Sequence, residues 1–391
     1  MITTIFLCVL GLLMIADLVK GLSANGTPPV LQRFSWQLHL AHFMWSHIVT
    51  IRIVLVVILI GLFWSMTAEE RSSIVIFSLL IGAAWGFVYW FFNHFWVGKK
   101  KFLPLTHPKF VTAADNEVDP SVQVVGIEWQ GHKKAFPVSM MFYHHQIPER
   151  IGDLPIWVTY CGLCRSGRVY KTLVGGQVLD FSLVGAITYN ATFKDNQTGS
   201  WWRQETGECV KGPHAGKELE DLPMEQMSLE NWLEKHPDTE ILQYEPKFKG
   251  RYNFITSLMN YEASLPGWHM QETPALVIGV EVGAQARAYD WNELKKKRMV
   301  MDSLADSDLL VVSSEDGSSA FVYDRQVNGE ALEFELDGDE LTDRTTGSRW
   351  DILGRCIAGT LQGNQLAGVQ NYQQFVRSWA TFHPHTTYYQ F

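Results

Sequence analysis

Three long apolar segments lie in the first hundred residues, and they constrain the fold more than any other feature of this sequence. They cover residues 2–19, 51–66 and 73–97. The first carries only Asp17 and the second only Arg52 as a charged residue, while the third ends in an aromatic cluster typical of a membrane interface. Each is close to the ~20 residues that a helix needs to cross a bilayer. The sequence therefore predicts an integral membrane protein with a transmembrane module of about three helices over residues 1–100.

The first apolar segment has a second interpretation, as a signal peptide cleaved near residues 21–25. A signal peptide begins with a positively charged stretch, and none precedes this segment, so a retained helix is favoured. The link at residues 21–50 carries His39, His42 and His47 among aromatic residues, several of them at helical spacing. This pattern predicts an amphipathic helix lying in the membrane interface, and a metal or quinone role for the histidines is the less favoured alternative.

Composition limits the remaining classes of protein. A chain of 391 residues is too long for one ordinary core, so two or three folding units are expected. A net charge of −9, without a basic stripe, argues against a nucleic-acid partner. Five cysteines in this length are too few for a disulfide scaffold.

The sequence after residue 120 contains two copies of one pattern. Motifs recur in the same order, at an offset of 153 residues early in each copy and of 147 to 148 residues later. The motif D-x-x-T-G-S-x-W starts at Asp195 and again at Asp343. The motif G-x-C-x-x-G starts at Gly207 and Gly354, and W-x-x-x-H-P-x-T starts at Trp232 and Trp379. Short segments rich in Val, Ile, Tyr and Phe between turn residues predict strands in both copies. One helix closes each copy, over residues 229–235 and 375–382, and a His-Pro pair ends it.

The duplication predicts a β-rich α+β domain of two lobes related by a pseudo-two-fold axis. The expected boundaries are a linker at residues 101–120, a first lobe at 121–245 and a second, degenerate lobe at 246–391. Each lobe then has a usual domain size.

Residues that occur in both copies are explained most simply by the fold, whereas a residue in one copy is a better candidate for chemistry. Cys209 and Cys356 occupy equivalent positions, and buried thiols are favoured over a disulfide between them. His236 and His383 each follow a predicted helix, where they would bond its last carbonyl groups.

One cysteine motif occurs in a single copy. Cys161 and Cys164 form a C-x-x-C pair directly after an apolar segment, residues 154–158, that predicts a buried strand. Such a pair can ligate a soft metal, carry out dithiol–disulfide exchange or close a structural disulfide. The equivalent positions of the second copy hold Ser314 and Gly317.

Two adjacent histidines have the same distribution. His144 and His145 correspond to Lys297 and Arg298 in the second copy. The first lobe therefore holds a Cys-Cys-His set that the second lacks, and this asymmetry favours a functional site. Thiolates with imidazole suit copper or zinc, and three protein ligands would leave one coordination position open.

Taken together, these motifs resemble the DUF3179 family of bacterial and archaeal proteins. The resemblance covers about residues 116–391 and rests on T-Y-C-x-L-C-x-S-G from Thr159, the T-G-S-x-W element, G-P-x-x-G-K-x-L from Gly212 and the H-P-x-T ends. The family has no settled activity. Its pattern implies a histidine seventeen positions before the first cysteine, which is His144 here, whereas His145 stands where an acidic residue is expected.

Two features of the sequence disagree about the side of the membrane on which the large domain lies. With three spanning helices, the link and the domain share one side, which carries Lys20, Arg33 and the lysines at 99–101 against Arg71 in the opposite loop. The positive-inside rule then places the domain in the cytoplasm. The resemblance implies export, because many members of the family carry signal peptides, and three spans from a cytoplasmic N-terminus leave the domain outside. We therefore favour the extracytoplasmic, periplasmic side.

Three functions follow from these features. The first is a membrane-anchored metal-binding protein with a copper- or zinc-dependent redox or transfer function. Its expected ligands are Cys161, Cys164 and His144, with a fourth from His145, Met140, Met141 or water. The second is an accessory or scaffold subunit of a membrane complex, in which the cysteines hold structural zinc. The third is a thiol–disulfide oxidoreductase, which ranks last because reactive C-x-x-C pairs usually begin a helix and this pair precedes a predicted turn and strand.

Overall fold

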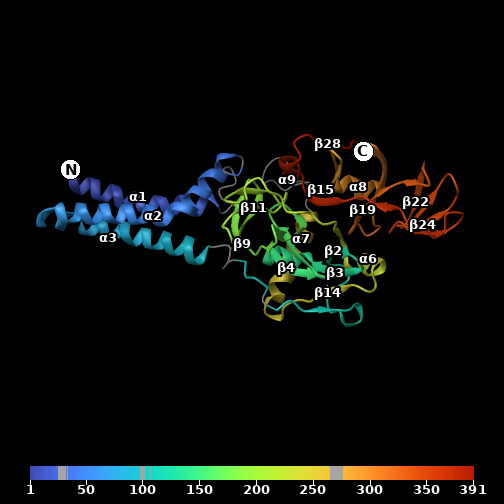
Figure 1. Ribbon diagram of the computed structural model, residues 1–391, viewed down its shortest axis with the longest axis horizontal. Coiled ribbons are helices and arrows are strands. Elements are labelled where there is room, and N and C mark those ends of the chain that lie inside the picture. Colours follow the sequence, from blue (N-terminus) through green and yellow to red (C-terminus); the bar gives the residue numbers. More distant parts are fainter. Residues whose placement is uncertain (25–31, 33, 97–101, 106, 265–275) are drawn as a thin grey trace. The chain divides into compact units, whose positions relative to one another are not determined.

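The computed structural model describes residues 1–24, 32, 34–96, 102–105, 107–264 and 276–391 (Figure 1). The chain divides into two compact units. The first contains Met1–Leu103, Asp180–Arg203 and Glu208–Lys217, and the second contains Pro104–Leu179, Gln204–Gly207 and Glu218–Phe391.

Three helices form most of the first unit (Figure 1). They are α1 (Ile2–Ser23), α2 (Trp36–Ser65) and α3 (Ala68–Trp90), and α3 continues as the π-helix η2 (Phe91–Phe95). Each helix is long and apolar enough to cross a membrane, which confirms the three predicted apolar helices. The loop before α3 ends in a capping box, in which the Thr67 side chain accepts from the Glu70 N–H and the Glu70 carboxylate accepts from the Thr67 N–H.

The start of α2 differs from the sequence-based expectation. Residues 36–50, predicted to form a separate interfacial helix, are the first turns of α2. No proline or glycine occurs between Trp36 and Gly61, so the hydrogen-bond ladder of the helix continues through the polar residues. His42 packs edge-on against Trp201, with 5.1 Å between the ring centres, so this histidine of the link takes part in packing.

A four-stranded antiparallel sheet completes the first unit. Its strands, in the order β12-β11-β10-β9, are β9 (Phe181–Ile187), β10 (Asn190–Asp195), β11 (Trp201–Arg203) and β12 (Cys209–Lys211). The β9–β10 hairpin is bonded to the helix ends: the Ala186 N–H donates to the Ala24 carbonyl at 2.9 Å, and the Thr188 N–H donates to the Gln37 side chain at 3.2 Å. These strands, which the sequence assigns to the first lobe, therefore group with the helices.

The second unit consists of several small sheets and short helices, which confirms a β-rich domain after the apolar helices. Its first part holds a five-stranded sheet in the order β1-β14-β3-β2-β13 and a three-stranded sheet, β4-β5-β6. The elements are β1 (Phe110–Val111), η3 (Ala113–Asp115), β2 (Gln123–Trp129), β3 (His132–Pro137), α5 (Val138–His144), β4 (Gln146–Ile151), β5 (Leu154–Cys161), β6 (Ser166–Lys171), β7 (Leu173–Val174), β8 (Gln177–Val178), β13 (Glu225–Ser228), α6 (Leu229–Lys235) and β14 (Glu240–Leu242).

The second part of this unit follows in the chain. Its larger sheets have the orders β27-β15-β16-β28, β17-β18-β19-β26 and β22-β23-β24-β25. The elements are η4 (Pro246–Phe248), α7 (Lys249–Ser264), β15 (Leu276–Val282), β16 (Gln285–Asp290), α8 (Trp291–Lys297), β17 (Met299–Leu304), β18 (Ser307–Ser313), β19 (Ala320–Asp324), β20 (Gln326–Val327), β21 (Glu330–Ala331), β22 (Phe334–Asp337), β23 (Glu340–Asp343), β24 (Arg349–Asp351), β25 (Cys356–Ala358), β26 (Ala367–Gly368), β27 (Asn371–Phe375), α9 (Val376–Phe382) and β28 (Thr387–Tyr388).

The two predicted closing helices are α6, with the expected bounds, and α9, which begins one residue later than expected. The Ser228 side chain caps α6 by accepting from the Asn231 N–H at 3.3 Å. His236 and His383 follow these helices, and each donates its backbone N–H to the carbonyl of the tryptophan four residues earlier. The His383 ring also lies 3.0 Å from that carbonyl, as the sequence predicts for a residue at a helix end.

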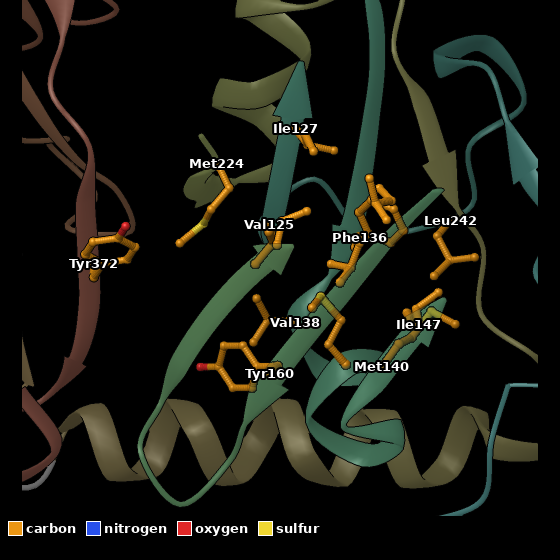
Figure 2. Close-up of a cluster of buried hydrophobic side chains, with 14 of the residues drawn as sticks. Val125, Ile127, Phe136, Val138, Met140, Ile147, Tyr160, Met224, Leu242 and Tyr372 are labelled. Atoms are coloured by element: carbon orange, nitrogen blue, oxygen red, sulfur yellow. The ribbon is translucent and has the colours of Figure 1, made fainter. Parts of the chain in front are cut away.

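A buried cluster of apolar side chains anchors the strand that carries the C-x-x-C motif (Figure 2). Val125 of β2, Phe136 of β3 and Val138 of α5 are buried in it, together with Tyr160 of β5. Tyr372 of β27 belongs to the same cluster, so the first and second parts of this unit share one core. The cluster contains Ile156, Val158 and Tyr160, so one face of β5 is held by packing up to the motif.

Candidate functional site

The C-x-x-C motif forms the turn of the β5–β6 hairpin. Cys161 is the last residue of β5 and pairs with Ser166, the first residue of β6. The Cys161 carbonyl accepts from the Cys164 N–H at 3.2 Å and from the Arg165 N–H at 2.8 Å. Arg165 has a φ of +63°, a left-handed conformation that is uncommon for a residue with a side chain. This turn brings the two cysteine side chains to the same side, with 2.8 Å between the Sγ atoms.

The turn is enclosed by the protein. Cys161 is 1 % and Cys164 is 0 % exposed. A side-chain carbon on Gly162 would come within 2.7 Å of the Phe142 ring, so this position of the turn accepts only glycine without a shift of that ring. The Cys164 carbonyl accepts from the Phe375 N–H at 2.8 Å, which ties the turn to the end of β27. The two sulfurs are therefore held in the interior.

The sulfur–sulfur distance lies between those of two chemical states. A disulfide bond is about 2.05 Å long, and two thiolates on one tetrahedral zinc ion, with bonds of about 2.3 Å, lie about 3.7 Å apart. None of the five cysteines, all of which lie in the described residues, is in a disulfide.

Cys209 and Cys356, the cysteines that occur in both copies, are buried as predicted. Burial raises the pKa of both thiols, which keeps them protonated at neutral pH. They behave as small core residues.

A buried polar network begins two residues after the second cysteine. The Ser166 hydroxyl donates to one oxygen of Glu205 at 2.5 Å, and Arg168 donates to the other at 2.7 Å. The Gln204 side chain donates to the Thr159 hydroxyl at 3.0 Å. All of these side chains are buried, so the ion pair of Arg168 with Glu205 lies in the protein interior.

Arg168 carries this network into the second part of the unit. Its guanidinium lies 3.4 Å from the centre of the Tyr372 ring and 3.4 Å from an oxygen of Asp221, and the Tyr372 hydroxyl donates to the same oxygen at 3.2 Å. Burial alone would lower the pKa of Arg168, but the charges of Glu205 and its other neighbours raise it well above the usual value. Burial raises the pKa of the Asp221 carboxyl against the effect of Arg168.

An aromatic and cationic layer lies beside the turn. Burial raises the pKa of Tyr160 to about 12, against the effect of Arg165, so its hydroxyl is neutral at physiological pH. The Arg165 guanidinium lies 5.3 Å from the centre of the Phe142 ring and 5.8 Å from that of Phe375. The residue that follows the cysteines thus adds a buried positive charge to the turn.

The structure places the predicted histidines at the end of α5. His144 is buried, and its Nε2 lies 2.7 Å from the Tyr252 hydroxyl. His145 ends the helix in a left-handed conformation, with a φ of +64°, and its carbonyl accepts from the Tyr160 N–H at 3.1 Å. The first of these contacts joins α5 to α7, and the second joins it to β5.

Of the predicted ligands, Cys161 and Cys164 are brought together directly. Met140 and Met141 are fully buried in the core cluster. Among the residues that the structure describes, no three His, Cys, Asp or Glu side chains converge as metal ligands. The larger ligand set stays a prediction.

Sequence reasoning missed Arg168, Gln204 and Glu205. The cysteines were chosen because they occur in one copy only, and the same is true of these three residues. At the offsets of 153 and 148 residues, the second copy holds the apolar Phe321, Ile352 and Leu353 instead. A buried ion pair at these positions therefore exists in one copy only. The asymmetry extends over the whole polar network and not only over the cysteines.

The comparisons with known proteins identify a family without an assigned activity. A family model described as "Protein of unknown function (DUF3179)" matches residues 101–386. No curated protein matches the chain, and no solved structure matches it. The matched segment includes the cysteine turn, the polar network and most of the second copy. The chain belongs to the DUF3179 family.

Proposed function

We propose that this is a membrane-anchored protein in which the thiolates of Cys161 and Cys164 bind one copper or zinc ion. The observation that carries the proposal is the convergence of two buried sulfurs in a turn fixed by backbone hydrogen bonds. Thiolate is the ligand that selects Cu(I) and zinc over harder cations. The three apolar helices supply the anchor.

Burial favours a metal over exchange with a protein disulfide. An exchanging thiol must be reached by the partner's sulfur, and Cys161 and Cys164 are 1 % and 0 % exposed. A buried thiolate also requires a positive partner, because an isolated charge in the interior is costly. A metal ion bound to both thiolates would supply that positive charge inside the protein.

His144 is the proposed third ligand, and His145 is one candidate for the fourth. A histidine that binds a metal usually holds its other ring nitrogen in a hydrogen bond, which fixes the tautomer. The Tyr252 hydroxyl, 2.7 Å from Nε2 of His144, would serve in this way. Met140, Met141 and water are the remaining candidates for the fourth position.

One observation favours a second candidate function. At 2.8 Å the two sulfurs are closer than ligands of a shared metal, and a small rotation would allow a disulfide to form. In that reaction the two thiols would lose two protons and two electrons, the electrons passing to a small disulfide or quinone able to enter the site. The third function is an accessory subunit with structural zinc. It would use the same metal site as the first function, but the bound metal would take part in no reaction.

We also propose that the β-rich region consists of two duplicated lobes related by a pseudo-two-fold axis. The support is that β2–β3–α5–β4–β5–β6 and β15–β16–α8–β17–β18–β19 follow the same order. Equivalent hydrogen bonds occur as well: the Trp202 and Trp350 indoles donate to Asp195 and Asp343, at 2.8 and 3.2 Å. A duplication explains why one copy could acquire a site while the other kept only the fold.

For the membrane orientation we propose that the β-rich region faces the extracytoplasmic side. Three crossings from a cytoplasmic N-terminus support it. The opposing charges at Arg33 and at residues 99–101 lie outside the described residues. Protease treatment of sealed spheroplasts tests the side, because an extracytoplasmic domain is cut without lysis.

Elemental analysis of the detergent-purified full chain tests the metal proposal. We expect about one copper or zinc ion per chain, in line with a single thiolate site, and loss of the metal in Cys161→Ser/Cys164→Ser. The control is Cys209→Ser/Cys356→Ser, which changes two other buried thiols and should keep the metal. No metal in the wild type, with both Cys161 and Cys164 labelled only after reduction, would replace the metal proposal with the disulfide one.

A further inference from the structure

The helices of the first unit enclose ionisable side chains that the proposed metal site does not use. Asp17 of α1 is fully buried, and Lys20, one turn later, is 8 % exposed. Arg52 of α2 forms an ion pair with Asp17. Charged residues within membrane segments are costly, face the interior of the bundle and mark functional sites by default.

The Asp17 carboxylate of this cluster accepts hydrogen bonds from Arg52 and Trp85. Arg52 Nε lies 3.3 Å from Oδ2 of Asp17, its Nη2 bonds Oδ1, and the Trp85 indole donates to Oδ2 at 2.8 Å. The Asn93 side-chain oxygen accepts from Lys20 at 2.5 Å and from Arg52 at 3.4 Å. One carboxylate and one amide oxygen thus serve two cations.

The cluster therefore carries an excess positive charge. Among the residues that the structure describes, two neutral rings also contact the cluster: Trp45, 4.7 Å from Lys20 Nζ, and Tyr89, 4.7 Å from the Arg52 guanidinium. The remaining acidic residues among the first hundred are Glu69 and Glu70, which belong to the first turn of α3, whereas Asn93 lies beyond its last turn. A cation in a medium of low dielectric constant is stabilised only by an anion or by strong hydrogen bonds.

Two residues of the cluster, Lys20 and Asn93, lie near the ends of their helices. Lys20 lies three residues before the end of α1 at Ser23, and Asn93 lies two residues before the end of η2 at Phe95. At a rise of about 1.5 Å per residue these side chains are attached about 3 to 5 Å from the helix ends. Lysine side chains near the ends of membrane helices are able to reach the phosphate layer.

We infer that Lys20 and Arg52 bind the phosphate of one anionic lipid, such as a phosphatidylglycerol, between the three helices. Basic sites between membrane helices recognise anionic headgroups in this way. A phosphate monoanion supplies the missing negative charge, and its oxygens accept from the ammonium and guanidinium groups. The inference rests on the proposed membrane anchoring and is independent of the metal site.

Native mass spectrometry of the full chain, released from nanodiscs of equal phosphatidylglycerol and phosphatidylcholine, tests this inference. The wild type is expected to retain one phosphatidylglycerol in preference to phosphatidylcholine. Lys20→Met should reduce the retained fraction about five-fold, the effect of one cation at an anionic surface. Arg71→Met is the matched control, because Arg71 of the first turn of α3 donates to the Phe63 and Trp64 carbonyls of the last turn of α2 and should not affect retention.

Three results would overturn the inference. They are equal retention of the two lipids by the wild type, unchanged retention in Lys20→Met, and displacement of the lipid by millimolar inorganic phosphate, which would make free phosphate the ligand. If Lys20→Met does not fold, the test uses the wild type and Lys20→Arg. Both should then retain phosphatidylglycerol in preference to phosphatidylcholine. Recovery of the protein from membranes without detergent would contradict the anchoring itself, whereas loss of lipid preference in a detergent-requiring protein contradicts only the lipid site.

Discussion

At the scale of single residues, His236 shows how burial makes stability depend on pH. Its ring packs on Trp232, with 4.2 Å between ring centres. Burial, with Lys235 and Lys133 nearby, lowers the pKa of His236 to about 4. Because the folded protein disfavours the charged ring, this contribution to stability is complete above the unfolded pKa of about 6.5 and is lost as the pH falls toward 4.

We predict that the thermal unfolding midpoint of the detergent-solubilised protein falls between pH 6.5 and 4, and that His236→Gln reduces this fall. The neutral amide cannot take up a proton, so its folded state has no charge to desolvate. His383→Gln is the control, since the His383 ring lies 2.9 Å from the Glu281 carboxylate and the change leaves His236 in place. Equal pH dependence in the wild type and in His236→Gln would show that another group is responsible.

At the scale of elements, the packing of α6 and α9 depends on two glycines. A side-chain carbon on Gly126 of β2 would lie 2.3 Å from the Trp232 ring, and one on Gly279 of β15 would lie 2.3 Å from the Trp379 ring. We predict that Gly126→Ala or Gly279→Ala lowers the free energy of unfolding by about 1–3 kcal/mol, the usual cost of overpacking. Chemical denaturation measures it. Gly368→Ala, which meets nothing within 4 Å, should be close to neutral.

The contact between α1 and α2 depends on the pair of Arg52 and Asp17. Arg52→Met leaves the fully buried Asp17 without its cation. We predict a loss of about 3–5 kcal/mol in stability, the usual cost of removing one partner of a buried pair. Asp17→Asn/Arg52→Met should recover part of it, because no charge is then left unpaired. A thermal stability in detergent equal for the single and double variants would contradict this account.

The sequence predicts an element well where local signals agree. α6 begins after a serine cap and ends before His236-Pro237, so its bounds follow from the chain alone. The start of α2 cannot be predicted in the same way, because polar residues interrupt the apolar pattern of the sequence without interrupting the helix. At the site, the cysteine turn after β5 is predictable, whereas the contact of Arg168 with Glu205 joins residues 37 positions apart and has no local pattern.

At the scale of the whole molecule, three apolar helices precede a β-rich region, as the sequence predicts. The grouping of β9–β12 with the helices is not predictable, because it depends on contacts such as Ala186 with Ala24. Anchoring by the helices predicts that the full chain stays in the membrane pellet after alkaline carbonate and is released by detergent. Release by carbonate alone would indicate a peripheral protein.

X-ray absorption spectroscopy of the purified full chain would show whether Cys161 and Cys164 hold one metal ion. Two thiolate ligands give a shell of two sulfur atoms, at about 2.3 Å if the metal is zinc, and this shell is expected to disappear in Cys161→Ser/Cys164→Ser. A metal surrounded only by nitrogen and oxygen, with the same spectrum in that variant, would show that the two cysteines do not bind it.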